Sequence, residues 1–101
     1  VRDAADRIGS FIDGLTIETY VSDDLRRSAV ERQLEIIGEA LNNLRRVDAE
    51  TAALIPDVHR IIGLRNVLAH GYAVVDDEVV WAAAFRRVPE LRALVDGLLA
   101  E

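Results

Sequence analysis

An arginine, an amide, an imidazole and a phenol lie within eight residues of one another in the second half of the chain. They are Arg65, Asn66, His70 and Tyr72. An arginine stays charged and a histidine titrates near neutral pH, so the pair suits cleavage of an RNA phosphodiester without a metal ion. The imidazole would take the proton from the ribose 2′-OH, and the guanidinium would stabilise the charge on the pentacoordinate phosphorus.

These residues also have a purely structural interpretation. An arginine commonly pairs with a carboxylate, and a histidine commonly caps the C-terminus of a helix. Tyr72 directly follows Gly71, a position typical of a side chain that packs where the chain leaves a helix. The spacing alone leaves both interpretations open.

Helical geometry decides which of the side chains share a face. At 3.6 residues per turn, Arg65 and His70 lie about 140° apart around the axis, whereas Asn66 and His70 share a face. A long arginine can reach round, and the dipole of the last turn favours the imidazolium form of His70. Cleavage needs both an acid and a base, and one copy of the motif offers a single imidazole. We therefore expect a two-fold dimer that supplies both.

The elements that position the motif are predicted to be helices, because apolar residues recur at steps of three and four between turn signals. The first helix carries Ile8, Phe11, Ile12 and Leu15 on one face, and a connecting turn is expected over Thr16–Val21. Further helices are expected over about Asp24–Arg46, Ala49–Leu54, Asp57–His70 and Glu78–Ala100. The expected capping residues are Ser22 or Asp23, and Asp76 or Asp77.

Two prolines and a glycine are expected to limit these helices. Pro56 pushes the residue before it out of the helical region, and Gly71 is the expected left-handed terminator of the motif helix. Pro89 lies inside the last helical stretch and predicts a kink or a split there.

The apolar residues expected to face inward lie on the long second helix and on the motif helix. They are Val30, Leu34, Ile37, Leu41 and Leu44, and Val58, Ile61, Ile62, Leu64 and Leu68. Val74 and Val75 are the only β-like residues, too few for a sheet. The sequence therefore predicts an all-α antiparallel bundle of four to five helices in a single domain, 1–101.

Composition narrows the class of protein. The net charge is −6, and all 12 basic residues are arginine. This acidity counts against a general nucleic-acid binder and against DNA, so any RNA contact must be local. The chain has no cysteine, which excludes thiolate chemistry. It shows no apolar run of about 20 residues and no signal-peptide pattern, so we expect a soluble, cytoplasmic protein without membrane contact.

Several segments of the chain together resemble the HepT-like branch of the HEPN superfamily. They are Ala29–Arg32, Ile36–Ala40, Ile55–Pro56, Ile61–Tyr72, Val75–Asp76, Val79–Trp81 and Val88–Leu91. The resemblance covers roughly 23–99, and the spacing Arg-x4-His-x-Tyr is fairly specific in that setting.

This resemblance implies a HEPN-like bundle that acts as a metal-independent endoribonuclease toxin of a type VII toxin–antitoxin system, with no cofactor. Members of the family dimerise, and the arginine and histidine of both subunits line one cleft. Carried over to this chain, Arg65 and His70 are catalytic and Asn66 is a polar helper. The implied partner is a minimal nucleotidyltransferase antitoxin of the MntA type, which transfers AMP to Tyr72. The bulky anion would then block RNA.

The chain departs from the family pattern after Pro56. The family often has a tryptophan shortly after this proline, whereas Asp57-Val58-His59-Arg60 follows it here. The change affects packing or the approach of RNA and leaves the motif intact. His59 is interpreted as a surface or packing histidine.

Three further features have two interpretations each. Glu39 lies on a polar stripe that is either a solvated face or the source of a salt bridge that orients Arg65, in one chain or across a dimer. Trp81 and Phe85, four residues apart, are predicted core aromatics, with a dimer or antitoxin interface as the alternative. Paired or neighbouring arginines form either a solvated surface or an RNA track: Arg45, Arg46, Arg60, Arg86 and Arg87.

Two rival functions remain open at this point. One is a non-catalytic helical module that binds a nucleotidyltransferase or another nucleotide-handling protein. The other is a structural dimer with no such partner. The small size and the acidic charge fit the helical module as well as they fit a ribonuclease.

Overall fold

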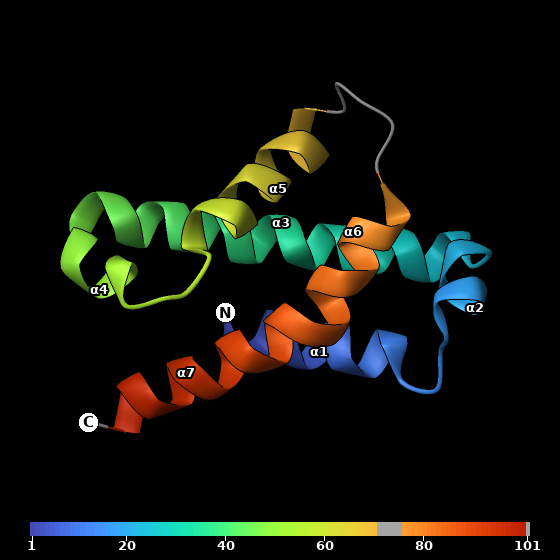
Figure 1. Ribbon diagram of the computed structural model, residues 1–101, viewed down its shortest axis with the longest axis horizontal. Coiled ribbons are helices and arrows are strands. Elements are labelled where there is room, and N and C mark those ends of the chain that lie inside the picture. Colours follow the sequence, from blue (N-terminus) through green and yellow to red (C-terminus); the bar gives the residue numbers. More distant parts are fainter. Residues whose placement is uncertain (71–75, 101) are drawn as a thin grey trace.

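Each apolar-periodic stretch of the chain is a helix in the computed structural model (Figure 1). The structure describes the backbone of residues 1–70 and 76–100 and the side chains of 1–69 and 76–97. Within these ranges no strand occurs, so the all-α prediction is confirmed. The helices are α1 (Arg2–Ile12), α2 (Ile17–Val21), α3 (Asp24–Val47), α4 (Ala49–Ala53), α5 (Val58–His70), α6 (Asp77–Ala82) and α7 (Val88–Ala100), with a π-helical turn η1 (Ala83–Arg87).

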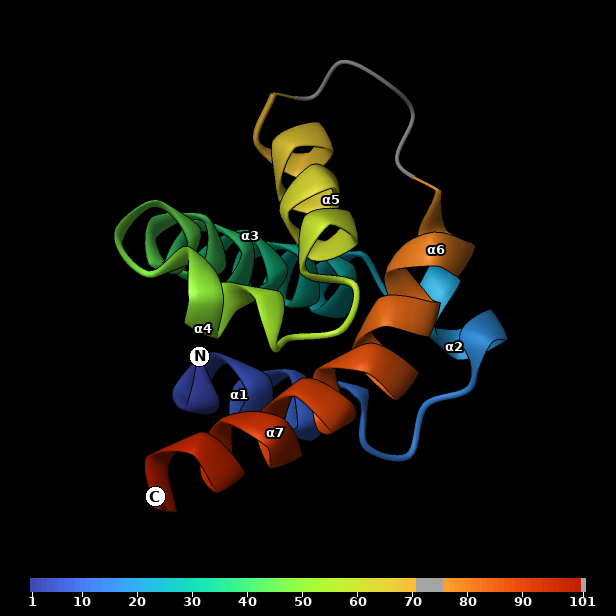
Figure 2. The ribbon, with the colours of Figure 1, turned by 60° about the vertical axis from the view of Figure 1, so that its left-hand side comes forward.

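The long helix α3 is the centre of the bundle. Asp23 caps its first turn by accepting a hydrogen bond from the Arg26 amide, one of the two predicted caps. The predicted stripe is confirmed, since four of its residues are buried and Leu44 packs at the edge of the core. Helices α1, α4 and α5 all pack against α3, and α5 leaves it obliquely (Figures 1 and 2).

Helices α1 and α7 form the other side of the bundle. They lie side by side in both views, and α1 separates α7 from α3 (Figure 2). An ion pair of 2.9 Å between Arg2 and Asp96 joins them, as does one between Arg92 and Asp6. The main core residues come from α1, α2, α3, α5, α6, η1 and α7 and from the segment before α5: Ala4, Ala5, Ile8, Tyr20, Val30, Leu34, Ile37, Leu41, Ile55, Ile61, Ile62, Val80, Ala83, Ala84, Val88 and Leu91.

The N-terminal region differs from the prediction in two places. Helix α1 ends at Ile12, and Gly14 follows with a φ of 76°, so the half-buried Leu15 lies beyond the helix. The segment Thr16–Val21, predicted as a connecting turn, contains the short helix α2. Its capping box explains the error, because the Thr16 and Thr19 side chains each bond the other residue's amide and so stabilise a single helical turn.

The interruption predicted at Pro89 is confirmed, and the structure shows its form. Asp76 caps α6, and the chain then widens into the π-helical turn η1 before α7 begins at Val88. The Val88 amide bonds the Ala83 carbonyl, five residues back. A proline ring clashes with the carbonyl four residues before it and lacks an amide proton, and the wider turn accommodates both effects.

None of the helices in the described ranges is both long enough and apolar enough to cross a bilayer. The predicted terminator Gly71, with Val74 and Val75, lies outside the described residues.

Candidate functional site

Arg65 lies on the side of α5 that faces α3. Its Cβ and Cγ rest against Gly38 of α3, and the residue is half-buried. The guanidinium emerges from this contact, where its Nη1 donates a hydrogen bond of 3.0 Å to Oδ1 of Asn66. The structure therefore brings together two of the residues that the sequence singles out, one as a catalytic group and one as its helper.

His70 is the last residue of α5, five positions beyond Arg65. The side chain of His70 lies outside the described residues, as does Tyr72. Their predicted roles remain predictions.

Glu39 is exposed on α3, next in sequence to the glycine beneath Arg65. Among the described side chains, no ion pair joins it to Arg65. This favours the solvated-face interpretation within one chain. A pairing across a dimer remains a prediction.

Three of the five arginines considered for an RNA track have partners within the chain. Arg60 pairs with Asp57 at 3.7 Å, and Arg87 pairs with the same carboxylate. Arg45 donates to the Asn42 amide oxygen at 2.9 Å. Asp57 has a φ of 58°, a left-handed conformation that aspartate adopts more readily than most residues. Its position before α5 lets one carboxylate link α5 to η1.

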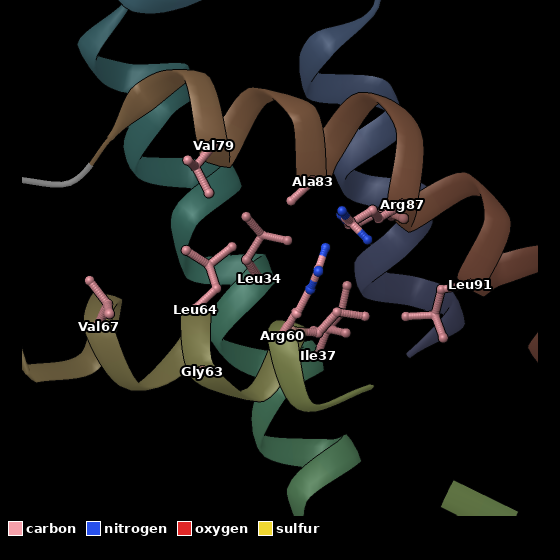
Figure 3. Close-up of a pocket in the computed structure, with 12 residues that line it drawn as sticks. Leu34, Ile37, Arg60, Gly63, Leu64, Val67, Val79, Ala83, Arg87 and Leu91 are labelled. Atoms are coloured by element: carbon pink, nitrogen blue, oxygen red, sulfur yellow. The ribbon is translucent and has the colours of Figure 1, made fainter. Parts of the chain in front are cut away.

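An open apolar groove of about 390 Å³ separates α5 from the α6–η1–α7 stretch, with α3 as its floor (Figure 3). Val67 and Val79 lie on opposite walls and are 40% and 52% exposed. Figure 3 shows the Arg60 and Arg87 guanidinium groups close to each other and away from the two valines. The sequence does not predict this groove, because periodicity assigns inward-facing residues but not the distance between two helices.

Of the two predicted core aromatics, Trp81 and Phe85, only Trp81 packs against the core. Trp81 packs against the core and lies 5.2 Å from the Tyr20 ring. Phe85 stacks on the outer face of Trp81 at 5.4 Å but is 56% exposed, so its assignment to the core is wrong. The π-helical turn explains the error, because it shifts the residues after Ala82 around the axis.

A polar cluster holds α6 against α2 and α3. Arg27 of α3 bonds Asp77 of α6 at 3.1 Å and also pairs with Asp24. The buried Tyr20 hydroxyl has no hydrogen-bond partner among the described residues. Burial, with the nearby Glu31 and Asp77, raises the pKa of this phenol far above its ordinary value. Burial likewise raises the pKa of the Glu31 carboxyl, and Asp77 adds to the rise.

The family model for ribonuclease HepT-like proteins matches residues 1–98, which include the whole of α5 and its Arg65–Asn66 pair. The chain belongs to this family. The resemblance to the HepT-like family is thereby confirmed, and the match extends beyond the predicted 23–99 to the N-terminal helix.

Individual relatives agree with the family assignment. A protein of Caldanaerobacter subterraneus subsp. tengcongensis named as a "putative RNase" is 34% identical over 88 residues, 87% of this chain and 78% of that protein. A "putative RNase" of Methanocaldococcus jannaschii is 32% identical over 95% of this chain and 78% of its own length. A "probable ribonuclease HepT" of Thermococcus cleftensis is 29% identical over 97% of this chain and 88% of its own length. No solved structure shows significant similarity to the chain.

Proposed function

We propose that this HepT-like protein is a metal-independent endoribonuclease whose catalytic groups are Arg65 and His70. The observation that carries the proposal is the match of the ribonuclease family to residues 1–98, together with the placement of Arg65 on α5. The α3 contact holds the stem of this arginine, and its guanidinium bonds the exposed Asn66 while the residue as a whole stays half-buried. A guanidinium in that setting is accessible to a phosphate and oriented before RNA binds.

The proposed reaction is an internal transfer at phosphorus. The His70 imidazole takes the proton of the ribose 2′-OH, and the 2′ oxygen forms a bond to phosphorus. Arg65 stabilises the charge on the pentacoordinate phosphoryl group. The bond to the 5′ oxygen then breaks, and an acid protonates that leaving oxygen. The products are a 2′,3′-cyclic phosphate and a 5′-hydroxyl.

The proposed active form is a homodimer, because a base and an acid are needed at the same time. A two-fold axis that brings two α5 helices together supplies a second His70 as the acid. Sedimentation velocity at micromolar concentration tests this step. A protein that sediments as a monomer while it cleaves RNA contradicts it.

The proposed regulation is modification of Tyr72 by a nucleotidyltransferase antitoxin of the MntA type. The phenolic oxygen attacks the α-phosphorus of ATP, and pyrophosphate leaves. The added AMP carries negative charge beside the RNA site and repels the substrate backbone. Intact-mass measurement after incubation with the partner and ATP tests the step. A protein mass that does not increase by one AMP group refutes the modification. Tyr72→Phe, which is expected to stay unmodified, is the control.

Induced expression in a bacterial host tests the ribonuclease assignment in cells. Wild type is expected to stop growth and deplete RNA, whereas Arg65→Ala and His70→Ala are expected to do neither. His59→Ala is the matched control, since it removes an exposed histidine from the same helix. Equal toxicity and equal RNA decay in all four proteins rule out the catalytic assignment.

The groove favours a second candidate function, a non-catalytic module that binds a nucleotidyltransferase. Exposed apolar walls of this kind are typical of protein interaction sites. Purified protein that leaves RNA intact at every pH and still binds the purified nucleotidyltransferase supports this alternative. Loss of that binding in Val79→Asp would assign it to the groove.

A further inference from the structure

Gly38 lies in the interior of α3, among the most buried residues of that helix. A glycine in the middle of a helix is disfavoured relative to alanine, because it loses more backbone freedom on folding. A position that keeps glycine against this cost commonly needs the space that a Cβ would fill. The two neighbours of Gly38 on the core stripe, Ile37 and Leu41, are large and fully buried.

The space over Gly38 is occupied by the stem of Arg65. A Cβ added to Gly38 would lie well inside contact distance of Arg65 Cβ, 2.8 Å from Arg65 Cγ and 3.3 Å from the Ile61 carbonyl oxygen. The nearest of these atoms belongs to the base of the side chain, which cannot swing away without the helix. By contrast, a Cβ at Gly9 of α1 meets nothing within 4 Å.

The Arg65 side chain is thereby restrained at both ends. The close approach of α3 and α5 at Gly38 sets where the Cβ and Cγ of Arg65 lie, and the hydrogen bond to Asn66 sets one edge of the guanidinium. A long side chain with both ends restrained keeps little rotamer freedom. The geometry is preorganised for a phosphate that approaches the open side of α5.

We propose that Gly38 is a positioning residue for the Arg65 guanidinium. It acts only through Arg65. Because Gly38 has no Cβ, α5 lies close enough to α3 for the Arg65 stem to fill the space over the glycine. The proposal rests on the proposed ribonuclease function, and it predicts that the smallest possible addition to α3, one methyl group, impairs cleavage.

The test compares Gly38→Ala with Gly9→Ala in steady-state cleavage of a short labelled RNA. In Gly38→Ala the two helices must separate by about 1 Å, a displacement that lowers the turnover of a positioned catalytic group about 100-fold. The kcat is expected to fall with little change in KM, because Arg65 contributes mainly in the transition state. Gly9→Ala is expected to cleave as wild type does.

A second comparison separates positioning from loss of stability. Val30→Ala removes a fully buried side chain from the same helix without touching Arg65. Under conditions in which Val30→Ala and Gly38→Ala are both folded, Val30→Ala is expected to keep its kcat. An equal fall of kcat in both variants overturns the proposal.

Gly38→Ala can be rescued structurally if it does not fold. The double variant Gly38→Ala/Arg65→Gly keeps the added methyl group and removes the Arg65 side-chain atoms with which it collides. Gly38→Ala is expected to lower the folding equilibrium constant at least about 10-fold with Arg65 present and at most about 3-fold in the Arg65→Gly background. Equal losses in the two backgrounds overturn the proposal.

The outcomes also distinguish this proposal from the ribonuclease assignment. If wild type cleaves RNA, Arg65→Ala does not and Gly38→Ala cleaves as wild type does, the positioning role is wrong and the ribonuclease stands. If wild type itself leaves RNA intact, both are wrong. A selective fall of kcat in Gly38→Ala supports both.

Discussion

The two walls of the groove, α5 and the α6–η1–α7 stretch, lie over the same helix α3. Both bury apolar residues, but they differ in the contacts that they add to this burial. The α5 wall rests on close apolar contact, with Ile61 and Ile62 buried and the Arg65 stem pressed onto Gly38. The α6 wall buries Val80, and it is joined to α3 by the Arg27–Asp77 ion pair and to α2 by the Tyr20–Trp81 ring contact.

The added contacts determine which wall responds to salt and pH. Apolar contact without voids responds weakly to salt and pH, and it resists displacement of the atoms involved. A half-buried ion pair surrounded by other ionisable groups depends on both. The helix that carries Arg65 is therefore the rigid wall, and the helix that follows the motif is the adjustable one.

The largest expected effect comes from a cavity under the rigid wall. Ile37→Ala removes a fully buried side chain of α3 that also lines the floor of the groove. The free energy of unfolding is expected to fall by about 2–5 kcal/mol. Val67→Ala, on the exposed side of α5, is the control and is expected to cost less than about 1 kcal/mol. Urea titrations measure both changes. Similar losses in free energy of unfolding for the two variants would contradict the distinction between the buried α3–α5 contact and the exposed side of α5.

The next effect concerns the adjustable wall. Asp77→Ala leaves Arg27, whose Nε already lacks a partner among the described residues, with only the more exposed Asp24. Breaking this pair is expected to lower the free energy of unfolding, by less than Ile37→Ala does. The loss should shrink in high salt, where the pair is screened. Glu78→Ala, one residue further along α6, is the control. A loss that does not change with salt contradicts the electrostatic account.

A small gain is expected when the groove is filled. Leu64→Phe adds volume on the α5 wall, where the groove has room for it. We expect the free energy of unfolding to change by less than about 1 kcal/mol, and toward greater stability, because added apolar surface is buried without overpacking. Thermal unfolding measures the change. A loss above about 2 kcal/mol would show that the groove closes in solution.

The smallest effect is a pH dependence of the adjustable wall. Burial raises the pKa of Glu31 in the folded state, so folding favours its protonated form, and stability is lost as pH rises through that pKa. Glu31→Gln removes this loss and is expected to stabilise the protein by up to about 0.5 kcal/mol at neutral pH. The gain should vanish below the ordinary pKa of a glutamate. A gain of the same size at pH values below and above that pKa contradicts the assignment to titration.

The sequence predicts the helices of this fold better than the spaces between them. Periodicity locates α3 and α5 to within one residue at each end, because a single buried stripe dominates each of them. It misses the helix α2, which one capping box stabilises, and misplaces Phe85, whose direction depends on a π-helical turn. Local hydrogen bonds of this kind leave little trace in an apolar pattern.

The site is predictable in part. Arg65 and Asn66 are recognisable from residue type and spacing, and the structure joins them. The contact of Arg65 with Gly38 joins two different helices, which no periodicity within one helix reveals. The one feature of the sequence that could have indicated this contact is a glycine in the middle of a long helix, next to Ile37 of the apolar stripe. The Arg27–Asp77 pair joins residues 50 positions apart and shows none.

The most direct test of the account is cleavage of a labelled RNA by purified protein in EDTA, with the fragment ends identified. Wild type is expected to produce fragments with 2′,3′-cyclic phosphate ends, His70→Ala and Arg65→Ala about 100-fold fewer or none, and His59→Ala the wild-type amount. Equal cleavage by wild type and His70→Ala, or intact RNA with wild type, would contradict the claim that α5 carries a ribonuclease site.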